Sequence, residues 1–237
     1  MWLTTSSIGR KVIMSVTGTA LILFLTFHAC MNVVALFSAE GYNMICEFLG
    51  SNWYAVAGTA VLAALIAIHF IYAVILTLQN RKARGQSRYA VTDKPEKVEW
   101  ASQNMFVLGV IICLGLVLHL FNFWFNMMFA EFANGGMAFA TDLSATDGYG
   151  MMKFTFHDAG TISIVYSVLY LIWFAAIWFH MTHGMWSAMQ TLGLSGKTWF
   201  NRWRCISNIY STCVMLCFAV VVLYFALGCA DCCGATC

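Results

Sequence analysis

The sequence predicts an all-α integral membrane protein with five transmembrane helices. Of its 237 residues, 61% are hydrophobic and only 9% are charged, a composition outside the range of soluble domains. Five apolar segments are long enough to cross a hydrocarbon core of about 30 Å. The chain contains one proline, Pro95, and the connections between the segments are short. Residues 1–237 are therefore predicted to form one transmembrane domain.

The predicted spans follow from apolar runs and the residues that flank them. The first span follows Arg10 and Lys11 and is longer than the apolar region of a typical secretory signal. It also lacks a small-residue cleavage site near its end. We therefore expect it to remain in the mature protein. In chain order, the five spans cover residues 12–37, 53–79, 102–130, 159–190 and 205–228. Amphipathic rings that prefer the headgroup region lie near span ends: Trp53, Tyr54, Trp100, Trp199, Trp203 and Tyr224.

The distribution of basic residues predicts the orientation. Of the 12 lysines and arginines, only Lys153 lies on one side of the predicted membrane. The others precede span one, separate spans two and three, or separate spans four and five. The positive-inside rule then places the N-terminus in the cytoplasm and the C-terminus outside. The polar stretch 80–99 is either a basic docking surface for a partner or a topology signal that also meets anionic lipid.

Four histidines lie inside four different predicted spans: His28, His69, His119 and His183. An imidazole is costly to place in hydrocarbon, so each one is a candidate functional residue. Neutral imidazoles from two facing helices are natural axial ligands for haem iron. The alternative for any single one is a hydrogen-bonded core histidine. Four of them on four helices favour two ligand pairs.

The depth of each histidine within its span predicts which ones pair. At 1.5 Å per residue, His28 and His119 lie roughly 24 and 25 Å from the cytoplasmic ends of their spans. His69 and His183 lie roughly 15 and 10 Å from theirs. These depths define an outer and an inner level, as two stacked haems require. His180, at roughly 15 Å, fits the inner level as well as His183 does.

Several short motifs occur in a characteristic order and spacing. They are Ser15–Gly18 ahead of His28, Ala67–Phe70 ahead of Arg81-Lys82, Leu118–Leu120, and His183-Gly184 ahead of Trp186–Gly193. Together they resemble the di-haem cytochrome b membrane-anchor subunit of succinate dehydrogenases and fumarate reductases, in its single-polypeptide, five-helix form. The resemblance covers spans one to four, whereas span five is generic.

The resemblance implies two haem b groups with assigned ligands. In that family, histidines of the first and third helices hold the outer haem, and those of the second and fourth hold the inner one. This implies His28 with His119, and His69 with His183, the pairing that depth also gives. The resemblance favours His183 over His180 as the ligand, because the family motif in the fourth helix matches His183-Gly184.

Further residues near the expected haems have polar side chains. Ser15 and Gln190 lie toward the cytoplasmic ends of their helices, where we expect them to contact the propionates of the inner haem. The alternative for Ser15 is a hydrogen bond to the backbone of its own helix. Some relatives carry a glutamate two residues before the fourth-helix histidine, linked to transmembrane proton movement. Met181 occupies that position here, which argues against such a proton pathway.

The resemblance also implies a function and partners. The protein would carry electrons between an iron–sulfur subunit and a membrane quinone, expected to be menaquinone, while a flavoprotein subunit interconverts succinate and fumarate. Both partner subunits would lie on the cytoplasmic side of a bacterial cytoplasmic membrane, in a dimer of heterotrimers. Glu47, on the outer side before span two, is the candidate for quinone protonation, and a solvated loop acid is its alternative. The direction of the reaction does not follow from the sequence.

Two other classes compete with this interpretation. Another quinone-linked dehydrogenase or hydrogenase would also use a di-haem cytochrome b. A non-redox transporter would be expected to carry charged residues or breaks within its spans, and the predicted spans have no interior charged residue. The cysteine cluster after span five is consistent with disulfides or a metal site. Its members are Cys229, Cys232, Cys233 and Cys237.

Overall fold

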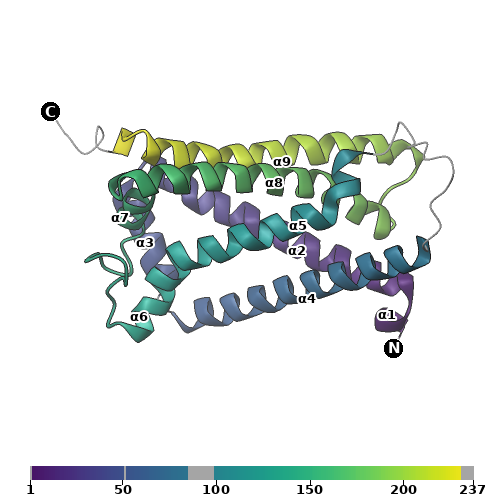
Figure 1. The fold of residues 1–237 in the computed structure, drawn as a ribbon, viewed down its shortest axis with the longest axis horizontal. Helices are drawn as coiled ribbons and strands as arrows, with labels where there is room; N and C mark the ends of the chain where they lie inside the picture. Colours follow the sequence, from purple (N-terminus) through teal and green to yellow (C-terminus); the bar gives the residue numbers. More distant parts are fainter. Residues whose placement is uncertain (1, 51, 85–98, 231–237) are drawn as a thin grey trace.

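Five long helices run side by side through the protein (Figure 1). The computed structural model describes residues 2–50, 52–84 and 99–230. Within them, five helices are long and apolar enough to span a membrane: Ser7–Leu36, Trp53–Ala83, Trp100–Ala133, Thr161–Thr191 and Lys197–Ala226. The predicted all-α fold with five transmembrane helices is confirmed, and the protein is a multi-pass membrane protein. The orientation of the termini stays a prediction.

The spans are built from continuous and composite helices. The elements that form them are α2 (Ser7–Val33) with the 3-10 turn η1 (Val34–Leu36), α4 (Trp53–Arg84), α5 (Trp100–His119) with the π-helical η2 (Leu120–Phe129) and α6 (Ala130–Ala133), α8 (Thr161–Thr191), and α9 (Lys197–Ala226). The shorter elements are α1 (Trp2–Thr5), α3 (Ala39–Gly50), α7 (Gly148–Lys153) and the π-helical η3 (Phe154–Asp158).

Two helices begin earlier than the apolar runs suggest. The α2 helix starts at Ser7 rather than at residue 12, and the Ser6 hydroxyl caps it by accepting the Gly9 backbone N–H at 2.9 Å. The α9 helix starts at Lys197 rather than at residue 205. Helical backbone continues through the basic and aromatic residues of the headgroup region, whereas an apolar run marks only the hydrocarbon part.

The α8 helix is the centre of the bundle. It packs along α9 and also contacts α5 and α2 (Figure 1). Phe174 on α8 and Phe218 on α9 meet in the main core, with ring centroids 5.6 Å apart. The α4 helix is peripheral: it packs mainly on α2, and its most apolar stretch has no buried residue. His69 therefore stands on the helix that is held least by apolar packing.

Short elements close one end of the bundle, where α3, α6 and α7 gather (Figure 1). The Asn43 amide donates to the Asp147 carboxylate at 2.7 Å and accepts the Tyr149 backbone N–H at 2.8 Å. Asp147 also caps α7 by accepting the Gly150 N–H at 2.9 Å. These bonds fix α3 against α7. The α1 helix lies at the opposite end of the bundle (Figure 1).

Candidate functional site

The imidazoles of His28 on α2 and His119 on α5 face each other. Their ring centroids are 5.9 Å apart, and the ring planes cross at 81°. His119 is the last α-helical residue before the π-helical stretch η2. Within η2, the side-chain amide of Asn126 donates to the Phe121 carbonyl at 3.0 Å. Such π-helical turns occur frequently at functional sites, and this one starts directly after a candidate ligand.

Aromatic rings enclose this outer pair. Phe24 and Phe218 lie 5.6 and 5.7 Å from the His28 ring, centroid to centroid. Trp173 lies 5.7 Å from the His119 ring and donates its indole N–H to the Ile112 carbonyl at 3.0 Å. The buried Nδ1 of His119 has no hydrogen-bond partner within the described part of the chain. Burying an unpaired polar nitrogen is costly, so this atom is consistent with a ring whose bonding is completed by a bound group.

On α4, the ring of His69 is held by α2. Its Nδ1 lies 3.0 Å from the Thr17 hydroxyl oxygen. Because the Thr17 hydroxyl donates to the Ile13 carbonyl at 2.9 Å, it accepts from His69 Nδ1–H. The lone pair of His69 is then on Nε2, the nitrogen free to bind a metal. Gly18 leaves space for the His69 ring beside α2, since a Cβ at position 18 would stand 3.2 Å from His69 Cε1.

Of the two candidates on α8, His180 is the one whose ring meets His69, with centroids 6.3 Å apart. The buried Nδ1 of His180, like that of His119, has no hydrogen-bond partner among the described residues. His183 instead directs its Nδ1 to Glu99 Oε2, at 3.3 Å. The structure thus brings together His69 and His180, whereas the resemblance chose His183. Three residues separate the two along α8, so they point to neighbouring but different surroundings.

Both ring separations suit a single metal centre between two imidazoles. Two metal–nitrogen bonds of about 2 Å, plus about 1 Å from each nitrogen to its ring centre, separate the centroids by about 6 Å. The observed separations are 5.9 and 6.3 Å. In residues 2–50, 52–84 and 99–230, no group of three or more His, Cys, Asp or Glu side chains is placed to hold a metal ion.

Sequence reasoning missed a polar cluster at the other end of the bundle from α3. Glu99, just before α5, accepts from His183 Nδ1 and from Trp186 Nε1, both at 3.3 Å, and forms an ion pair with Arg204 on α9. Partial burial raises the pKa of Glu99, but the bonds from His183 and Arg204 outweigh it, so the pKa lies below its usual value. The signal available in the sequence was the position of Glu99, the last of three acids in a basic stretch and the one that directly precedes a predicted span.

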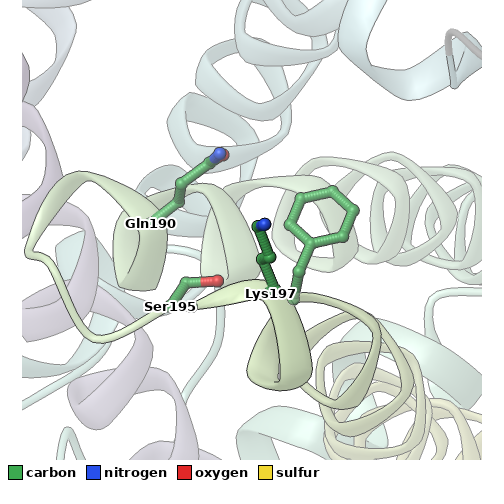
Figure 2. Close-up of a pocket in the computed structure, with 5 residues that line it drawn as sticks. Gln190, Ser195 and Lys197 are labelled. Atoms are coloured by element: carbon green, nitrogen blue, oxygen red, sulfur yellow. The ribbon is translucent and has the colours of Figure 1, made fainter.

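The remaining candidates lie in different places. Ser15 is buried on α2, and Glu47 is exposed on α3. Gln190, at the end of α8, lines a shallow cavity of about 290 Å³. Figure 2 shows the polar ends of Gln190, Ser195 and Lys197 around this hollow.

Two sequence features fall largely outside the described residues. Positions 85–98, most of the proposed basic docking surface, lie there. The last three cysteines of the C-terminal cluster, Cys232, Cys233 and Cys237, also lie there.

Comparisons with protein-family models, with curated proteins and with solved structures gave no match.

Proposed function

We propose that this protein is a di-haem cytochrome b that carries electrons through the membrane. The observation that carries the proposal is the presence of two histidine pairs, one between α2 and α5 and one between α4 and α8, with ring separations of 5.9 and 6.3 Å. Two imidazoles, with no third ligand placed beside them among the described residues, would suit haem iron, because the macrocycle would supply the remaining nitrogen ligands. One-electron transfer is the chemistry that such a group supplies when bound.

The proposed ligands follow the geometry. His28 and His119 hold the outer haem, and His69 holds the inner one from α4. For the fourth ligand, the ring separation from His69 supports His180, whereas the motif resemblance supports His183. We adopt His180, because its ring faces His69, whereas the Nδ1 of His183 is bonded to Glu99.

The other residues of the chain position the ligands and exclude water. Thr17 fixes the His69 tautomer, so that Nε2 carries the lone pair. Phe24, Phe218 and Trp173 surround the outer pair with apolar surface, which keeps the site dry. A dry, rigid site favours electron transfer because little solvent must reorganise.

The biological setting in this proposal comes from the motif resemblance. The protein is then the membrane anchor of a succinate:quinone oxidoreductase in a bacterial cytoplasmic membrane. Its partners are a flavoprotein and an iron–sulfur subunit, and its electrons are exchanged with a membrane quinone. Glu47 is the proposed proton acceptor for the quinone. Ser15 and Gln190 are proposed propionate contacts, and Gln190 already lines a polar hollow.

Haem content of the purified protein tests the proposal. A pyridine haemochrome assay should give two b haems per chain, and a ratio near zero would refute it. His28→Ala and His119→Ala should remove the same haem, and His69→Ala and His180→Ala should remove the other. His157→Ala, outside the five spans, is the matched control and should retain both. If His183→Ala loses the inner haem and His180→Ala keeps it, the ligand on α8 is His183.

A further inference from the structure

The cluster around Glu99 connects three helices next to the inner histidine pair. Glu99 immediately precedes α5, His183 and Trp186 belong to α8, and Arg204 belongs to α9. The Glu99 carboxylate receives hydrogen bonds from His183 and Trp186 and pairs with Arg204. The exposed fractions of the His183, Glu99 and Arg204 side chains are 13%, 30% and 42%. The cluster is thus fixed, only partly solvated, and carries one negative and one positive charge.

Helix geometry places this cluster close to the proposed inner ligand. His183 follows His180 by three residues, which is about 4.5 Å along the axis and nearly the same face of α8. The His183 ring is held from two sides, by the Glu99 carboxylate and by Trp186, whose ring centroid lies 4.9 Å away. Holding His183 also fixes the rotation of this part of α8, and with it the direction of His180.

We infer that Glu99 and Arg204 form a charge pair that sets the redox potential of the inner haem, with Glu99 acting as a positioning residue through His183. The inference rests on the proposed di-haem function. Oxidation of the iron adds one positive charge to the haem. A fixed carboxylate nearby stabilises that charge and lowers the potential, whereas a fixed guanidinium raises it. In a partly buried site these effects are screened less than at the surface.

The two members of the pair therefore have opposite predicted effects. Glu99→Gln removes the negative charge and leaves Arg204 unopposed, so the inner haem should become easier to reduce. Arg204→Gln leaves the negative charge of Glu99 unopposed, so the inner haem should become harder to reduce. Each change should alter the reduction equilibrium constant at least threefold, or about 28 mV at 59 mV per tenfold for one electron. A merely structural role would not give shifts of opposite sign.

The experiment is a spectroelectrochemical titration of the purified holoprotein. The inner haem is identified as the wave that is missing in His69→Ala. We expect the inner wave to shift up in Glu99→Gln and down in Arg204→Gln, with the outer wave fixed. The double variant and the charge-preserving Glu99→Asp should both lie nearer the parent than Glu99→Gln does. Arg202→Gln is the matched control: it removes one exposed charge from the same helix, at a side chain that lies over the Trp199 ring, and should move neither wave.

The outcomes separate this inference from the proposed function. Suppose that the parent protein contains two haems, but the inner wave stays fixed or shifts in the same direction in both single variants. This result would overturn the inference and leave the proposed function intact. Equal shifts of both haems would also overturn it, because the pair would then act only through net charge. Parent protein without haem would overturn the function and the inference together.

Discussion

Thr17 on α2 accepts a hydrogen bond from the imidazole of His69 on α4, with 3.0 Å between Oγ1 and Nδ1. This bond crosses between helices at a point where apolar packing is sparse, because the apolar stretch of α4 has no buried residue. It also determines which ring nitrogen is available to a ligand. A single hydroxyl thus contributes both to the attachment of α4 and to the chemistry of the inner histidine pair.

Thr17→Val tests this relationship, since it keeps the side-chain shape and removes the acceptor. Hydrogen-bonded neighbours of metal ligands typically change metal affinity by about 10- to 100-fold. We therefore expect Thr17→Val to lose inner haem preferentially during purification, while the outer haem stays at parent occupancy, as measured by haem content and low-temperature spectra. Thr19→Val is the control, because the Thr19 hydroxyl donates to the Ser15 carbonyl of its own helix. Equal haem content in both variants would contradict the assigned role of Thr17.

Gly115 and Trp173 provide a test of the outer pair. A Cβ at position 115 would clash with Trp173 Cδ1, so Gly115→Ala must displace the indole that lies beside His119. Overpacking of this kind costs about 1–3 kcal/mol. We expect a lower melting temperature and partial loss of the outer haem. Gly109→Ala, on the same helix with no atom within 4 Å of the added Cβ, should behave like the parent protein. A parent-like Gly115→Ala would argue against the described position of Trp173.

Cys46 is predicted to be an unreactive thiol. Burial raises its pKa to about 11, while the Tyr42 hydrogen bond lowers it only in part. The thiolate is the reactive form, so maleimide labelling of Cys46 at pH 8 should be slow and should rise about tenfold per pH unit toward pH 11. Cys229, which is exposed beyond the end of α9, is the internal control and should label quickly. Peptide mass spectrometry gives both rates. Equal rates at pH 8 would show that Cys46 is not buried between α3 and Gly148 of α7.

The sequence was sufficient for the fold class because hydrophobic length alone specifies a membrane helix. It was less informative about helix ends: residues 197–204 are helical although they include Lys197, Arg202 and Arg204. Propensity and polarity do not separate a helix that continues into the headgroup region from a loop there.

The candidate site was predictable in part. Depth along each span placed His28 beside His119, because axial position depends only on residue count. It could not choose between His180 and His183, which differ in rotation about α8 and in their neighbours. The Glu99–Arg204 pair joins residues 105 positions apart in the chain, and no local sequence pattern predicts such a contact.

The last prediction concerns Glu47, which is exposed on α3, the helix that caps the end of the bundle with α7. General-base action on a quinol requires a carboxylate within hydrogen-bond reach of the hydroxyl proton. Glu47→Gln keeps the side-chain shape but removes the basic oxygen, so quinone-linked turnover should fall at least tenfold.

The remaining readouts separate this role from assembly. Haem content should stay at the parent value, and succinate oxidation with an artificial acceptor at the soluble subunits should persist. Glu40→Gln, at the start of the same helix, is the matched control for charge and should keep parent turnover. If Glu47→Gln also keeps parent turnover, Glu47 is only a solvated acid on α3. Under the proposed function, the quinone would then exchange its protons elsewhere, and the Glu99 cluster at the opposite end would be the next place to test.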